Sequence, residues 1–247
     1  VPVHVVGAPQ FDALRDPRFE EPKAAFSARH GLDADLPIIV YAVGSPNFLD
    51  EKHGAIELAG RVQRGELGDV QMLVRPHPIH DRNEMRSLFA GFGPRVVLQG
   101  HSEPERVLRE RSMDEHDVLD WVSTFRHADV VVNLSSTVTI DAAIFDKPVV
   151  NLEFDPSPGQ AQAQLIHEIN HHWVHFKPVA ESGGVWPAHS HDEVADAVRH
   201  YLSDPSLHRD RRRWMVEHVC GGPVDGKAGA RLAAAIAAEA DRLERSA

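Results

Sequence analysis

Short apolar runs separated by amphipathic segments dominate the chain of 247 residues. Five of these runs are apolar at their centres and rich in β-branched residues, which is typical of strands buried on both faces of a parallel sheet. They span residues 37–43, 70–75, 95–99, 129–133 and 149–152. The segments between them repeat apolar residues three and four positions apart, which predicts helices. These segments span residues 50–64, 81–89, 114–127 and 137–145.

The alternation of strands and helices predicts an α/β fold class: a Rossmann-like, mainly parallel sheet with helices on both faces. Weaker patterns predict strands at 3–6 and 174–179, and we interpret 102–113 as a surface insertion. Further helices are predicted at 160–172, 190–202, 206–219 and 227–245.

The pattern divides the chain into three parts. Residues 1–36 form an entry segment, 37–226 form the Rossmann-like domain, and 227–247 form a C-terminal helix. The chain opens in mid-strand and without a methionine, so we expect it to be one piece of a longer protein.

The composition limits the kinds of binding partner and the cellular compartment that we expect for the protein. A formal net charge of −11 argues against broad binding to nucleic acid or to anionic lipid. The single cysteine, Cys220, excludes an internal disulfide and favours a reducing compartment. No stretch approaches the roughly 20 apolar residues of a membrane span. We therefore expect a cytoplasmic location, with at most peripheral association at the inner face of the membrane.

Three loops carry the candidate chemistry. Right-handed crossovers place every strand-to-helix loop at one edge of a parallel sheet, and ligands bind at that edge. The loop after the first strong strand contains Gly44 and Ser45. The next candidate loop follows Arg75 and places His77 between Pro76 and Pro78. The third contains Ser135, Ser136 and Thr137, directly before a predicted helix.

Each loop has a functional and a plainer interpretation. Free backbone N–H groups and a helix dipole at Ser135–Thr137 favour phosphate, although these residues are equally typical of a helix cap. The flanking prolines fix the direction of the His77 ring, which then donates to a phosphate oxygen or remains a surface imidazole. The Gly44 loop lacks the G-x-G-x-x-G and G-K-[ST] spacings, so neither a dinucleotide fingerprint nor a P-loop is supported.

A metal site is not predicted. His167, His171 and His172 lie close in sequence to Glu168, and residues four apart share a helix face. Their order is H-E-x-x-x-H rather than H-E-x-x-H, so the pattern departs from that of zinc proteases by one residue. We interpret these histidines as solvated or capping.

Two motifs resemble those of known transferases. The sequences V-R-P-H-P at 74–78 and N-L-S-S-T at 133–137 resemble the paired HP and SS motifs of bacterial transferases with CMP-linked donors. Those families include sialyltransferases, Kdo transferases of capsule synthesis and CDP-glycerol glycerophosphotransferases of teichoic-acid synthesis. Residues 128–151 also resemble the nucleotide-binding half of GT-B glycosyltransferases, where S-x-x-x-E-A-x-x-x-G-K-P-V follows the same strand. This chain has Asp141 in place of the usual Glu and Asp146 in place of the usual Gly.

The resemblance extends to both ends of the chain. Residues 5–12 are similar to the crossover segment that enters the C-terminal half of such proteins, and the D-G-K-A sequence within 222–228 resembles the segment before the final helix of the glycerophosphotransferases. This implies the C-terminal half of a GT-B fold, with its N-terminal domain elsewhere in the full-length chain. An isolated half is expected to be inactive, because the family places the catalytic base in the other half.

The resemblance also implies roles for the loop residues. His77 and the Ser135–Thr137 turn would bind the phosphates of a nucleotide-activated donor, with Pro78 beside His77. Asp141 would bind the ribose, and Arg75 would add charge or form a structural ion pair. Gly44 and Ser45 would lie near the interdomain cleft. The donor is then a substrate, and no separate cofactor is expected.

The implied function is donor binding in a glycosyltransferase or polyol-phosphate transferase that makes bacterial cell-surface polysaccharide. The donor would be CMP- or CDP-activated, and the acceptor a saccharide or a glycolipid. Three alternatives remain: a relative of the UDP-sugar 2-epimerases, a glycosyltransferase that uses a UDP- or GDP-sugar, and a nucleotide-binding module without enzymatic activity.

Overall fold

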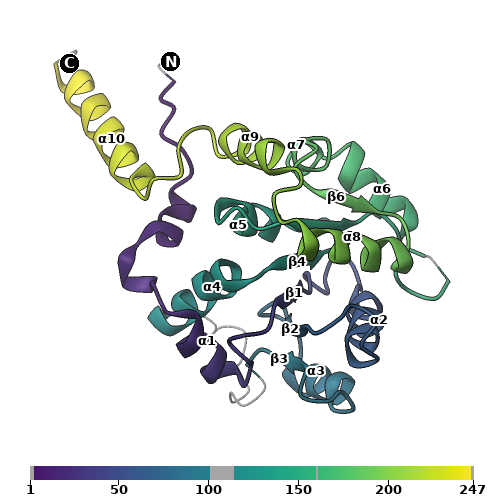
Figure 1. The fold of residues 1–247 in the computed structure, drawn as a ribbon. Coiled ribbons are helices and arrows are strands. Elements are labelled where there is room, and N and C mark those ends of the chain that lie inside the picture. Colours follow the sequence, from purple (N-terminus) through teal and green to yellow (C-terminus); the bar gives the residue numbers. More distant parts are fainter. Residues whose placement is uncertain (1–2, 101–113, 160, 246–247) are drawn as a thin grey trace.

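A six-stranded sheet forms the centre of the protein (Figure 1). The computed structural model describes residues 3–100, 114–159 and 161–245. Every pair of neighbouring strands is parallel, and the strand order is β3-β2-β1-β4-β5-β6. The expected Rossmann-like fold is therefore confirmed. The strands are β1 (Ile38–Ala42), β2 (Gln71–Arg75), β3 (Val96–Leu98), β4 (Val130–Asn133), β5 (Val149–Leu152) and β6 (Trp186–Ala188).

The central strands are buried on both faces, which explains their unbroken apolar sequences. Every residue of β1, β4 and β5 is buried. Val40 pairs with Leu73 of β2 on one side and with Val131 of β4 on the other. Since both faces of the sheet are covered, no position in these strands requires a solvated polar side chain.

Helices cover both faces of the sheet. On one face α2 packs against α8, and on the other α4 contacts both α1 and α5 (Figure 1). Asp81 begins α3 as predicted, accepting a hydrogen bond from the Glu84 amide at 2.8 Å. The α-helices are α1 (Lys23–His30), α2 (Lys52–Gln63), α3 (Arg82–Phe89), α4 (Glu115–His127), α5 (Val138–Ile144), α6 (Ala163–His171), α7 (Lys177–Ala180), α8 (His191–Ser203), α9 (Arg209–Val219) and α10 (Ala228–Glu244).

Two weak strand predictions are wrong. Residues 3–6 form no strand but an exposed segment beside α10, where Arg231 donates from Nε to the Val6 carbonyl at 2.9 Å. The predicted strand at 174–179 is replaced by α7, because Pro178 lies in its first turn, where a missing N–H costs nothing. The sixth strand is instead β6, a short edge strand that tolerates Pro187. The proposed insertion at 102–113 lies outside the described residues.

Both chain ends project from the sheet layers. The entry segment contains two 3-10 helices, η1 (Pro9–Arg15) and η2 (Pro17–Phe19). In Figure 1, α10 extends away from the sheet alongside the N-terminal segment, and only Ala228 of this helix is buried. None of the helices in the described ranges is long and apolar enough to span a bilayer.

Candidate functional site

The carboxyl edge of the sheet has its switch point between β1 and β4. The chain moves outward from β1 to β2 and β3, and then returns to place β4 on the other side of β1. Crevices at such a reversal are the usual ligand sites of open α/β sheets. The loops after β1 and β4 flank the switch point, and the loop after β2 is the next neighbour. The structure therefore brings the three predicted loops to one edge.

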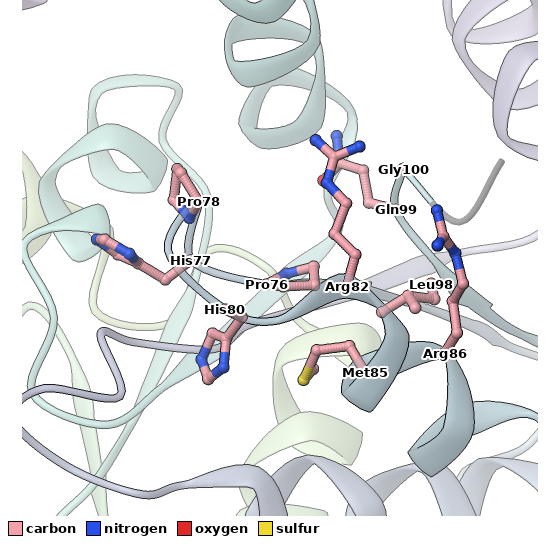
Figure 2. A pocket seen from close by; sticks show the side chains of 10 residues that line it. All are labelled: Pro76, His77, Pro78, His80, Arg82, Met85, Arg86, Leu98, Gln99 and Gly100. Carbon is pink, nitrogen blue, oxygen red and sulfur yellow. The ribbon is translucent and has the colours of Figure 1, made fainter. Parts of the chain in front are cut away.

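The loop after β2 holds His77 in a defined orientation. The Ile79 amide lies 3.4 Å from His77 Nδ1, which acts as the acceptor, so the neutral ring carries its proton on Nε2. Burial lowers the pKa of His77, and the nearby charges of His80 and Arg75 lower it further. Figure 2 shows the ring pointing away from the side chains of Arg82 and Arg86. At neutral pH His77 is thus a neutral N–H donor rather than a cation.

A small hollow lies beside the same loop (Figure 2). It holds about 70 Å³ of open space and is lined by residues that include His77, Pro78, His80 and Gln99. Ligand pockets commonly measure about 300–1,000 Å³, so this hollow does not enclose a nucleotide. A larger hollow of about 620 Å³ lies beside the edge strand β3, but its lining is mostly apolar and shares none of the predicted loop residues. We therefore expect a ligand to lie across the open sheet edge.

The Ser135–Thr137 turn differs from the prediction of free amides. The amide of Ser135 donates to Asn151 Oδ1 at 2.8 Å, and that of Ser136 donates to Asn133 Oδ1 at 2.9 Å. Both asparagine side chains are fully buried at the ends of their strands, so they occupy these two N–H groups from below. The expectation that both amides are free for phosphate is wrong for this conformation.

Other polar groups of the turn remain available. Thr137 begins α5 without a side-chain cap, so the plain capping interpretation does not hold for it. Ser136 is partly exposed and Thr137 is exposed, so their hydroxyls reach the surface. Ser135 has a φ of 48°, an uncommon conformation for a residue other than glycine, and its Oγ accepts from Asn170 Nδ2 at 2.8 Å. The turn therefore offers an anion mainly hydroxyl groups.

Asp141 is largely buried beneath the turn. Its carboxylate accepts a hydrogen bond from Trp121 Nε1 at 3.1 Å, and only 7% of the residue is exposed. Burial raises the pKa of Asp141 to about 6, although the Trp121 bond and the charge of Arg75 oppose the rise. Trp121 occupies only Oδ2 of this carboxylate, and a ribose contact at Asp141 stays a prediction.

Arg75 provides positive charge at the end of β2. Its guanidinium lies 5.6 Å from the centre of the Phe125 ring. Burial lowers the pKa of Arg75, while the carboxylates of Asp141 and Asp120 oppose that effect. Within the described ranges, no carboxylate lies close enough to this guanidinium for a salt bridge. The structural ion pair is therefore not seen among the described residues, and a role of Arg75 in ligand binding stays a prediction.

Asp146, which stands where the related sequence pattern has glycine, has a structural role. Its φ of 58° lies in the left-handed region, where the related pattern has glycine and where aspartate is tolerated. The carboxylate accepts from Arg212 Nε and Nη2 at 3.1 and 2.9 Å, and Arg209 Nε lies 2.8 Å away. Arg212 is fully buried, so Asp146 neutralises a charge that has no contact with solvent. The Asp146 side chain therefore anchors α9 to the turn after α5.

Two polar residues that no sequence pattern indicated link the loops. His80 is 4% exposed, and its Nε2 donates to the Gly44 carbonyl at 2.9 Å. Glu51 is 1% exposed and accepts a hydrogen bond from the Gly44 amide. Gly44 is therefore a junction between loops rather than an open turn. Ser45 forms the turn that follows, where its carbonyl accepts from the Phe48 amide at 3.0 Å.

The three histidines of α6 form a loose surface group. The His167 ring centre lies 4.5 Å from that of His171 and 5.8 Å from that of His172. Glu168 accepts a hydrogen bond from Gln164 instead of facing these rings. Among the described residues, the one compact group of potential ligands is Asp114, His116 and Asp117 at the start of α4. It is largely exposed, and such groups are common without an ion.

The architecture matches that of several solved structures whose chains are about twice as long. No protein-family model matches the chain. No curated protein matches it either. Among solved structures, the wall teichoic acid polymerase TagF matches with a TM-score of 0.60 and 15% identity, covering 98% of this chain and 53% of that one.

Two further solved structures share the fold. The UDP-GlcNAc 2-epimerase from Neisseria meningitidis, bound to UDP-GlcNAc, matches with a TM-score of 0.55 and 14% identity over 96% of this chain and 56% of that one. MnaA from S. aureus, solved with UDP, matches with a TM-score of 0.54 and 18% identity, covering 92% of this chain and 52% of that one. The chain thus spans about half the length of the structures it resembles. At such identities the likeness establishes the fold alone.

Proposed function

We propose that this chain is the donor-binding half of a transferase that uses a CMP- or CDP-activated donor. The observation that carries the proposal is the arrangement at the switch-point edge. There the end of β2 provides Arg75, the loop after it provides His77, and the turn after β4 provides Ser136 and Thr137. One cation, one neutral N–H donor and two hydroxyls suit the phosphates of a nucleotide that lies across this edge.

The same groups suit the chemistry of a leaving nucleotide. When the bond to the donor group breaks, negative charge grows on the phosphate oxygens. Donors that are already fixed in place stabilise that charge without having to reorganise. His77 contributes as an N–H donor, since its lowered pKa keeps it neutral at neutral pH. Arg75 contributes the positive charge.

The donor class and the partners rest on resemblance. The paired HP and SS motifs support a cytidine nucleotide, and the likeness to TagF supports a donor-binding role in cell-surface polymer synthesis. An N-terminal GT-B domain would provide the catalytic base and the site for a saccharide or glycolipid acceptor. The chain covers 53% of TagF, which leaves room for such a domain in the full-length protein.

A second candidate is a relative of the UDP-GlcNAc 2-epimerases. The observation that favours it is the comparable fold match to the Neisseria meningitidis enzyme and to MnaA. Both candidates would bind a nucleotide at this edge, but they differ in the base. The identity of the base therefore separates them.

A thermal-shift screen with CMP, CDP, UDP and GDP tests the proposal. Stabilisation by the cytidine nucleotides alone supports the transferase, and stabilisation by UDP alone supports the epimerase. The His77→Ala variant should lose the shift, whereas His218→Ala, an exposed histidine on α9, should retain it. No shift with any of the four nucleotides would contradict both candidates.

A further inference from the structure

The backbone N–H and C=O groups of Gly44 bind different side chains: the N–H donates to Glu51, and the C=O accepts from His80. We propose that Glu51 is a positioning residue that clasps the Gly44 loop to the turn after β4, with His80 extending the clasp to the loop after β2. This inference rests on the proposed function, because its purpose is to hold the phosphate-binding groups of two loops at a fixed separation.

Glu51 lies immediately before α2, beneath the switch point. Burial raises the pKa of Glu51 to about 8, so its carboxyl group is mainly protonated at neutral pH; it accepts from the Gly44 amide, and the Leu134 amide faces the same group. The Tyr41 hydroxyl is a third donor, at 3.4 Å. All three groups belong to β1, β4 or the loops that follow them, so one side chain serves both sides of the crevice.

The clasp begins where the sheet pairing ends. The last paired residues of β1 and β4 are Tyr41 and Val132, so Gly44 and Leu134 lie beyond the ladder of backbone hydrogen bonds. A buried N–H group without a partner costs free energy comparable to a lost hydrogen bond. Glu51 supplies an acceptor to the Gly44 amide and faces the Leu134 amide as the strands diverge. The carboxyl group thus continues the link between β1 and β4 up to the turn.

His80 extends the link to the third loop. Its Nε2 donates to the Gly44 carbonyl at 2.9 Å, and its own amide donates to the His77 carbonyl at 2.9 Å. His77 is therefore tied to Gly44 through His80, and Gly44 is tied to Leu134 through Glu51. Ser135 and Ser136 follow directly. The separation between His77 and the serine turn depends on this chain of contacts.

Two glycines leave room for the clasp. A Cβ atom on Gly44 would lie 2.6 Å from Glu51 Oε1. A Cβ atom on Gly54 would lie 2.5 Å from the Tyr41 hydroxyl, the other donor to the carboxyl group. Neither glycine has a positive φ, so close approach rather than backbone conformation requires glycine here. Any side chain at either position would displace a member of the clasp.

The test compares Glu51→Gln with Glu57→Gln, which changes a partly exposed carboxylate on the same helix. Amide hydrogen exchange at Gly44 and Leu134 reports the clasp directly, and CDP affinity by calorimetry reports its effect on the site. In Glu51→Gln we expect exchange at both amides to accelerate about tenfold or more, and CDP affinity to fall by a similar factor. The Glu57→Gln variant should match wild type in both measurements.

A second signature separates positioning from general stability. In wild-type protein the amide proton shifts of Gly44 and Leu134 should titrate together with the Glu51 carboxyl group, and Glu51→Gln should abolish that titration. Gly44→Ala provides a second route to a broken clasp if Glu51→Gln fails to fold. Its control is Gly91→Ala, where the added Cβ meets no atom within 4 Å.

Each outcome decides a different claim. Unchanged exchange at both amides would overturn the clasp, and faster exchange with unchanged CDP affinity would overturn its positioning role. If wild-type protein binds none of the four nucleotides, the proposed function fails. In that case the exchange and titration measurements still decide whether Glu51 holds the two loops together.

Discussion

The side chain of Asn151, the third residue of β5, accepts the backbone N–H of Ser135 at 2.8 Å. Its own Nδ2 donates to Asn170 Oδ1 at 2.9 Å, and Asn170 in turn donates to Ser135 Oγ. These three residues come from a strand, a helix and the candidate turn. The turn is therefore held from beneath by a buried polar network rather than left free at a helix end.

Replacing Asn151 with alanine should destabilise the protein and loosen the turn. The substitution removes the acceptor of the Ser135 amide and the donor to Asn170 Oδ1, which costs about 1–3 kcal/mol for each group left unsatisfied. Urea denaturation measures the change. Asn83→Ala, an exposed residue of α3, is the control and should stay within about 0.5 kcal/mol of wild type.

Asp141 should make stability fall as the pH rises from about 4 to about 6. Its folded-state pKa is raised to about 6 by burial, so the folded protein holds a proton that the unfolded chain has already lost. Asp141→Asn should remove this part of the pH dependence. Trp121 fluorescence provides a local measurement, because its indole donates to the titrating carboxylate. A wild-type emission that stays constant between pH 4 and 7 would contradict the assignment.

Asp120 should affect the pH dependence of stability in the opposite direction to Asp141, so that its contribution is lost as the pH falls. Burial favours its neutral form, but hydrogen bonds and charge from His30 and Arg29 outweigh burial and depress its pKa. Its contribution to stability is therefore complete above the unfolded pKa of about 3.9 and disappears as the pH falls below that value. At pH 7, Asp120→Asn should cost about 3 kcal/mol in urea denaturation, because Arg29, His30 and Gln99 all bind this buried carboxylate. Asp192→Asn removes an exposed pair with Arg61 and should cost less than about 1 kcal/mol.

Asp146→Gly should destabilise the protein even though glycine suits a φ of 58°. Glycine would relieve the strain of the positive φ. That relief is smaller than the cost of leaving the fully buried Arg212 without its carboxylate, which we expect to be about 3 kcal/mol. Thermal unfolding measures the change. A glycine variant as stable as wild type would show that Arg212 does not depend on this ion pair.

The strong strands were predictable from sequence because the central ones are buried on both faces. Their unbroken apolar runs reflect the local environment, and the two errors occurred where that signal was weak. At 174–179 the decisive residue was Pro178, which favours the first turn of a helix as readily as it disfavours a central strand. The real sixth strand has only three residues, so it presents almost no pattern.

The loops of the site were predictable, but their contacts were not. Topology alone places 44–47, 76–80 and 134–137 at one edge. The partners of their backbone groups are distant in sequence: His80 binds Gly44 across 36 positions, and Asn151 binds Ser135 across 16. Such contacts depend on strand order and loop curvature, which no local pattern contains. The same dependence explains why the serine amides were expected to be free.

The most direct test of the account is calorimetric titration of CDP and UDP into wild-type protein and into the His77→Ala and Arg75→Gln variants. Arg75→Gln removes the charge while keeping a long polar side chain. The account predicts that wild type binds CDP more tightly than UDP, and that each substitution weakens CDP binding about tenfold or more while the fold is retained. CDP affinity that is unchanged in both variants would contradict the placement of the phosphates between the loop after β2 and the Ser135–Thr137 turn.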